Sequence, residues 1–122
     1  MDEVRIQRIQ SMMKDELSVL INRELKDPRV PLVSVTQVDL TRDAKQATIY
    51  ISLISINQTS GDPELMKTCL EGLTTAKGFL RKQISHIMRL RYMPDLIFKE
   101  DKGLENTLRV HELLKQISNE KK

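Results

Sequence analysis

The first 26 residues carry apolar side chains at intervals of three and four positions. In this segment the apolar positions are Ile9, Met13, Leu17, Leu20, Ile21 and Leu25. This spacing puts them on one side of an α-helix, so residues 2–26 are predicted to form an amphipathic helix. Pro28 is expected to end it, because the residue before a proline is pushed out of helical geometry.

Two β-strands are predicted after this helix, at residues 32–40 and 44–56. The first is rich in valine and threonine. In the second, Ala47, Ile49, Ile51 and Leu53 alternate with other residues, as on a half-buried strand. The intervening residues 41–45 are few and mostly polar, which favours an antiparallel hairpin. Residues 57–61 have the composition of a loop.

A second amphipathic helix of about 28 residues is predicted from Asp62-Pro63, where a capping residue precedes a proline at the first helical position. Its apolar stripe runs from Leu65 to Met88, and Gly78 falls inside it. Glycine inside a helix costs about 1 kcal/mol relative to alanine, so its presence needs a reason. Either the helix bends there or something approaches its backbone closely.

A third strand at residues 93–99 and a last helix at residues 103–118 complete the predicted elements. Pro94 indicates that this strand begins near a sheet edge or at the proline itself. The order helix, strand, strand, helix, strand, helix predicts an α+β fold with helices on one face of a three-stranded sheet. A chain of 122 residues fits one domain, here residues 1–118, with residues 119–122 as a frayed tail.

The composition is typical of a chain that stays in the cytoplasm. Apolar residues make up 39% of it, which is enough for a core without a disulfide or a metal. The single Cys69 lies among apolar neighbours and is interpreted as a core residue. The charged N-terminus and the short apolar runs predict neither a signal peptide nor a membrane span.

Positive charge is concentrated in one part of the chain. Five cations and no acid lie between residues 71 and 95, so this segment carries +5 and the rest of the chain, from a total of +3, sums to −2. On a helical wheel one side of this segment carries Arg81, Lys82, His86 and Arg89. Solvated helices normally interleave charges of both signs. We therefore interpret this side as a surface for phosphates, with an acidic protein partner as the alternative.

The sequence offers no set of residues suited to catalysis. His86 and His111 lack further His or Cys at metal-ligand spacing, and no glycine-rich phosphate loop or nucleophile elbow is present. We therefore expect no enzyme activity, no cofactor, no metal and no small-molecule substrate. Two Tyr, two Phe and no Trp leave little aromatic surface for stacking single strands, which favours folded RNA as the partner.

A second group of cations, Arg23, Lys26 and Arg29, surrounds the sharp bend at Pro28. The residues alone favour a capped helix end over a binding site here. In that interpretation Asp27 bonds nearby backbone amides, as aspartates in turns do.

Seven short motifs resemble the ribosome-binding factor A family. They are residues 24–30 (ELKDPRV), 35–38 (VTQV), 41–43 (TRD), 47–52 (ATIYIS), 76–81 (AKGFLR), 88–91 (MRLR) and 94–96 (PDL). One such motif alone would be weak, but the series keeps the order and spacing of the family from about residue 5 to about residue 110. The resemblance therefore covers nearly the whole chain.

This resemblance implies a type II KH-like fold, α-β-β-α(kink)α-β followed by a C-terminal helix. A kink at Ala76-Lys77-Gly78 would stand where ordinary KH domains have a GxxG loop, which gives Gly78 its reason. The resemblance also implies an assembly factor that binds the free small (30S) ribosomal subunit and its 16S rRNA. Such a factor promotes late maturation and processing of the 16S rRNA precursor and is important for growth in the cold.

By similarity, RNA contacts are expected at Lys77, Arg81, Lys82, Arg89, Arg91, Arg23, Lys26, Arg29, Arg42 and Lys45. The expected mechanism is recognition of RNA shape and phosphate arrangement, since the deep major groove of RNA denies side chains access to base edges. The protein is expected to act as a monomer, without a membrane. Binding one RNA arrangement better than another would shift the population towards it without bond chemistry.

Overall fold

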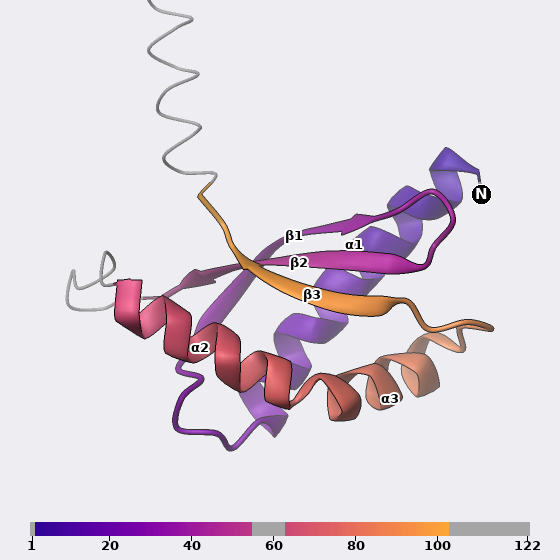
Figure 1. Ribbon diagram of the computed structural model, residues 1–122. Coiled ribbons are helices and arrows are strands. Elements are labelled where there is room, and N and C mark those ends of the chain that lie inside the picture. Colours follow the sequence, from indigo (N-terminus) through magenta and orange to yellow (C-terminus); the bar gives the residue numbers. More distant parts are fainter. Residues whose placement is uncertain (1, 55–62, 103–122) are drawn as a thin grey trace, which may run out of the picture.

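The computed structural model describes residues 2–54 and 63–102 (Figure 1). Its elements in chain order are helix α1 (Glu3–Val19), the π-helical turn η1 (Leu20–Glu24), strands β1 (Val33–Leu40) and β2 (Gln46–Leu53), helices α2 (Pro63–Thr75) and α3 (Lys77–Met88), and strand β3 (Asp95–Glu100). The helix predicted at 103–118, the loop at 57–61 and the tail at 119–122 lie outside the described residues. The α+β fold class is confirmed.

The three strands form one sheet in the order β1-β2-β3. Strands β1 and β2 pair antiparallel, as the hairpin prediction requires, and β2 and β3 pair parallel. A parallel pair needs a crossover between its strands, which α2 and α3 supply. Strand β3 is an edge strand that begins directly after Pro94, two residues later than predicted, where the missing proline N–H breaks no ladder bond.

A β-bulge in β1 reconciles two apolar phases of its sequence. Val33 and Val35 are buried, and so are Val38 and Leu40, although strict alternation would turn the second pair to the opposite face. The register shifts between Val35 and Gln37, which inserts one extra residue against β2. All four side chains therefore reach the same buried face.

The core lies between this sheet face and the helices. Helix α1 packs on β1, α2 packs on β3, and α3 contacts both α1 and β3. The largest fully buried side chains are Met13, Leu17, Ile49, Ile51, Leu73, Leu80, Ile84 and Leu96. Cys69 is fully buried among them, and burial raises the pKa of its thiol to about 11, which confirms its interpretation as a core residue.

The first helix ends at Glu24 rather than at residue 26, and its last turn is widened. The Leu25 N–H donates to the Leu20 carbonyl at 3.3 Å, an i→i+5 bond, and Leu25 itself is extended. Within this turn the Asn22 side chain donates to the Val33 carbonyl at 2.9 Å and accepts from the Val33 N–H at 3.0 Å. The turn thus ties the end of the first helix to the first residue of β1.

The predicted interruption of the long second helix falls at Ala76. This residue has φ −85° and ψ 1°, which separates α2 from α3. Backbone bonds continue across it, because the Ala76 N–H reaches the Gly72 carbonyl at 3.1 Å and the Leu80 N–H reaches the Ala76 carbonyl at 3.0 Å. The segment is therefore two helices joined at a kink, not one helix of 28 residues.

Candidate nucleic-acid interface

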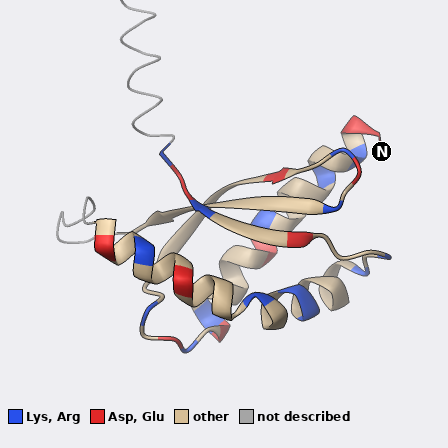
Figure 2. Cartoon of the chain, viewed as in Figure 1, with Lys and Arg blue, Asp and Glu red and all other residues tan. Residues whose placement is uncertain are grey.

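The cations expected to contact RNA do not form one surface. Lysine and arginine occur on α3, at the β1–β2 turn, along α1 and in the turn after η1 (Figure 2). Arg5 and Arg23 are 18 positions apart on the first helix, which is roughly 27 Å at about 1.5 Å per residue. The β1–β2 turn lies towards the N-terminal end of α1, and the turn after η1 lies towards the other end (Figure 1).

Arg81 and Lys77 are engaged within the protein. The Arg81 guanidinium donates from Nε to the Pro94 carbonyl at 3.2 Å and from Nη2 to the Met93 carbonyl at 3.0 Å. Lys77 Nζ lies 3.5 Å from Asp95 Oδ1. Both cations therefore tie α3 to the start of β3. The helical wheel groups Arg81 with Lys82, but its guanidinium points to this connection instead.

The other three residues of that wheel group stay together. Lys82, His86 and Arg89 are exposed and line one shallow hollow on α3. Arg89 ends this helix in the left-handed conformation, at φ 52° and ψ 43°. That geometry usually falls to glycine, so an arginine here carries a strain of about 1 kcal/mol. Its charge also lies at the negative end of the helix, which offsets part of this strain.

Two arginines of α1 complete the basic surface at this end of the molecule. Because α1 packs against α3, Arg5 and Arg8 line a hollow together with Arg89 and Arg91. We call these four residues the arginine corner. Asp2 also lines this hollow, but its Oδ1 accepts the Val4 N–H at 3.2 Å and caps α1.

Arg5 and Arg8 were not among the cations predicted from the sequence to contact RNA. Their spacing of three puts them on neighbouring turns of one helix, a signal that was available. Without the packing of α1 on α3, however, nothing linked them to a segment more than 80 residues further along the chain.

The turn after η1 is an ordered aspartate turn. The Asp27 carboxylate accepts the Arg29 backbone N–H at 2.9 Å and the Arg29 Nη2 at 2.7 Å, and these bonds lower its pKa. The turn packs closely on α2: a Cβ on Gly72 would lie 2.7 Å from Val30 Cγ2. Arg23 and Lys26 stay exposed. The interpretation of Asp27 from the residues alone is therefore confirmed.

The β1–β2 turn carries the remaining two cations, Arg42 and Lys45, and both are exposed. The turn is held by Asp43, whose Oδ1 accepts from Thr41 Oγ1 at 2.7 Å and from the Lys45 N–H at 3.1 Å. The same bonds lower the pKa of Asp43. Ala44 closes the turn at φ 59°. The direction of this turn brings Lys45 towards the arginine corner.

A family model described as ribosome-binding factor A matches residues 5–114. The chain belongs to this family. Ribosome-binding factor A of Finegoldia magna is 45% identical over 118 residues, which is 95% of this chain and 93% of that one. Ribosome-binding factor A of Brevibacillus brevis is 38% identical over 120 residues, 98% of this chain and 94% of that one.

Solved structures of ribosome-binding factor A share the fold. The crystal structure from Thermus thermophilus matches with a TM-score of 0.64 at 23% identity, over 78% of this chain and 94% of that one. A homology model of the Thermus thermophilus protein, fitted into a cryo-electron-microscopy map of its complex with 30S, matches with a TM-score of 0.59 at 24% identity, over 76% of this chain and 91% of that one.

Two further observations concern residues 2–54 and 63–102 alone. No group of three or more His, Cys, Asp or Glu side chains in them comes close enough together to hold a metal ion. Their helices are all too short or too polar to span a bilayer. The described residues do bring positive charge together from three segments: the start of α1, the end of α3 with the connection that follows it, and the β1–β2 turn.

Proposed function

We infer that the protein is a ribosome assembly factor that binds the free 30S subunit through its 16S rRNA and promotes late maturation and processing of the 16S rRNA precursor. It works by binding alone, as a monomeric KH-like domain over residues 1–118, in the cytoplasm. The family name and the 30S complex of the Thermus thermophilus relative support the partner. An importance for growth in the cold is part of the same proposal.

The arginine corner is the observation that carries this proposal. Arg5 and Arg8 come from the start of α1, Arg89 from the end of α3 and Arg91 from the connection to β3. Arginine binds phosphate with a planar fork of donors, so four arginines around one hollow suit closely spaced phosphates. The Asp2 carboxylate also lines this hollow, where it accepts the Val4 N–H as the cap of α1.

In this proposal the cations outside the corner differ in how directly they contact the RNA. Lys82 continues the basic surface along α3, while Lys45 and Arg42 extend it at the β1–β2 turn. Arg23, Lys26 and Arg29 belong to η1 and the turn after it, and form a separate contact in which Arg29 uses the donors that its ion pair with Asp27 leaves. Lys77 and Arg81 act mainly by fixing the start of β3, and contact RNA only with the donors that remain.

A rigid basic surface provides a mechanism without bond chemistry. The corner joins a helix, a helix end and a short connection that are packed together, so the backbone positions that carry its four arginines keep fixed spacings. One arrangement of the rRNA phosphates then fits better than others, and binding shifts the population towards it. A maturing subunit held in that arrangement exposes its precursor RNA to processing by other enzymes.

Sedimentation separates this function from the adaptor alternative. The protein is mixed with free 30S subunits, with 70S ribosomes and with naked 16S rRNA, and the bound fraction is measured after centrifugation. We expect binding to free 30S subunits over 70S ribosomes, binding to naked rRNA, and release from the subunits on ribonuclease treatment. Retention on ribonuclease-treated subunits without binding to naked rRNA would favour a protein adaptor and contradict the proposal.

A further inference from the structure

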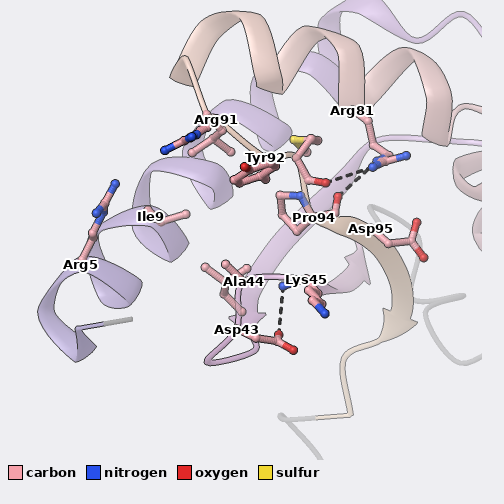
Figure 3. Close-up of a pocket in the computed structure, with 13 residues that line it drawn as sticks. Arg5, Ile9, Asp43, Ala44, Lys45, Arg81, Arg91, Tyr92, Pro94 and Asp95 are labelled. Carbon is pink, nitrogen blue, oxygen red and sulfur yellow. Dashed lines mark hydrogen bonds between the residues drawn. The ribbon is translucent and has the colours of Figure 1, made fainter.

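A hollow of about 730 Å³ lies between the start of α1, the β1–β2 turn and the α3–β3 connection (Figure 3). Apolar side chains form much of its lining, and they come from all three segments: Ile9, Leu40, Leu90 and Met93. Its size falls within the range of roughly 300–1,000 Å³ that small ligands occupy in proteins. The hollow adjoins the arginine corner, because Arg5 and Arg91 line both.

The charges that line this hollow sum to +2, from Arg5, Lys45, Arg81 and Arg91 against Asp43 and Asp95. Both of its carboxylates have partners: Asp43 accepts two bonds within its turn, and Asp95 pairs with Lys77. The Arg81 guanidinium is likewise engaged, by two backbone carbonyls. Among the described residues, no ion pair or hydrogen bond engages the side chains of Arg5 and Lys45, although the charge of Lys45 attracts the Asp43 carboxylate. The hollow therefore favours an anionic occupant.

Tyr92 adds an aromatic face to the same hollow. It is 74% exposed, so the core does not require its ring. The Arg91 guanidinium lies 5.4 Å from the centre of that ring, which keeps a cation beside the aromatic face. Figure 3 shows Tyr92 between Arg91 and Pro94, with Arg5 on one side of the hollow and Ala44 and Lys45 on another.

Hydrogen bonds hold the backbone on two sides of the hollow. Arg81 holds the carbonyls of Met93 and Pro94, which sets the path of the backbone directly after Tyr92. On the other side the Lys45 N–H is held by Asp43, and the Thr41 N–H donates to the Gln46 carbonyl at 2.9 Å. A preformed site loses less conformational entropy when it binds its ligand.

We propose that this hollow takes one unpaired nucleotide of the RNA, with its base stacked on Tyr92 and its flanking phosphates held by Arg5, Arg91 and Lys45. This rests on the proposed function and names the part of the RNA recognised there. Unpaired bases of folded RNA are typically bound by stacking on an aromatic ring or an arginine, and this site offers both. One exposed ring suits one base, which fits a chain with too few aromatic residues for a single-strand platform.

An acidic peptide is the competing occupant, and the distribution of cations disfavours it. Each nucleotide is flanked by a phosphate on either side, and the cations likewise stand on more than one side of the ring. An acidic peptide offers carboxylates to the cations but no planar base to stack on the ring face, so it uses only part of what the site presents.

Two substitutions at position 92 test the stacking. Tyr92→Phe keeps the ring, and Tyr92→Leu keeps apolar bulk without it; the exposure of the side chain makes both compatible with folding. We expect Tyr92→Leu to weaken binding to free 30S subunits by about 5- to 150-fold, the range for loss of one base–aromatic stack, with Tyr92→Phe close to wild type. The dependence of affinity on salt is expected to stay unchanged in both, because no cation is removed.

Crosslinking identifies the occupant. Benzoylphenylalanine placed at position 92 is expected to crosslink to one unpaired nucleotide of 16S rRNA in the 30S complex, mapped by reverse transcription. Wild-type affinity for Tyr92→Leu, or crosslinks only to ribosomal protein or to paired rRNA, would overturn this inference. A different result would contradict the proposed function: failure of the wild-type protein to bind the 30S subunit through its RNA.

Discussion

Gly78 lies at the second position of α3, and the space in front of its α-carbon is open. A Cβ built there meets no atom of residues 2–54 and 63–102 within 4 Å, and its φ is not positive. Gly72 differs, because a Cβ there would lie 2.7 Å from Val30 Cγ2 and 3.2 Å from Arg29 Cβ. Packing among the described residues therefore explains Gly72 but not Gly78. A partner that approaches the backbone of α3 closely would explain it.

Gly78→Ala separates folding from binding at this residue. We expect the free energy of unfolding, measured in urea, to rise by up to about 1 kcal/mol, because alanine is the better helix former and its methyl group meets no described atom. The affinity for 30S subunits is expected to fall, since that methyl group occupies the space of the partner. Gly72→Ala is the matched control and is expected to lower stability, because Val30 must move. Unchanged affinity of Gly78→Ala would show that nothing approaches this glycine.

At the residue scale the sequence predicted the environment of several side chains, but it did not predict which distant residues they contact in the fold. The apolar neighbours of Cys69 were enough to place it in the core, and Asp27 beside a proline was enough to predict its turn. A helical wheel gives the direction in which Arg81 leaves the helix axis, but not the groups that its guanidinium contacts. The carbonyls that it meets, those of Met93 and Pro94, depend on how the chain returns to β3.

The connection between α3 and β3 is an element whose geometry depends on one side chain. Arg81 bridges the helix to two successive carbonyls just before the strand begins. Arg91 and Tyr92, which line the hollow, lie in this same connection. An arginine of the basic segment thus shapes the site as well as contributing charge to it.

Arg81→Ala is expected to lower the free energy of unfolding by about 1–2 kcal/mol, because two half-buried carbonyls lose a charged donor. Urea denaturation measures this. Lys82→Ala, at the exposed neighbouring position, is the matched control and should change stability by no more than about 0.5 kcal/mol. Equal stability of the two variants would mean that Arg81 does not hold the connection.

The helices and strands were predicted from the spacing of apolar residues. The π-helical turn η1 and the β-bulge in β1 were not. The alternation of Ala47, Ile49 and Ile51 gave β2, and the spacing of Met13 and Leu17 gave α1. The π-helical turn was missed because it depends on the approach of β1, which Asn22 binds. The bulge left a trace in the sequence, since Val33–Val35 and Val38–Leu40 are out of phase, and its position could have been predicted.

On the scale of the whole molecule, the proposed interface depends on packing that joins distant parts of the chain. The start of α1, the end of α3 and the connection to β3 supply the arginine corner, and the β1–β2 turn brings Lys45 to its side. The excess of charge in residues 72–94 predicted part of this surface. Arg5 and Arg8 could not be assigned to it, because only the contact between α1 and α3 places them there.

The most direct test of the account compares the salt dependence of 30S binding in two variants with the same loss of charge. One replaces the arginine corner by glutamine at Arg5, Arg8, Arg89 and Arg91; the other replaces four exposed lysines, Lys14, Lys67, Lys99 and Lys102. The slope of log affinity against log salt is negative, and we predict that it becomes less negative by about 3 to 4 in the corner variant, about 1 for each lost phosphate contact. In the lysine variant we predict a change of less than about 1. Equal slopes in the two variants would contradict the account, because net charge and not the corner would then govern binding.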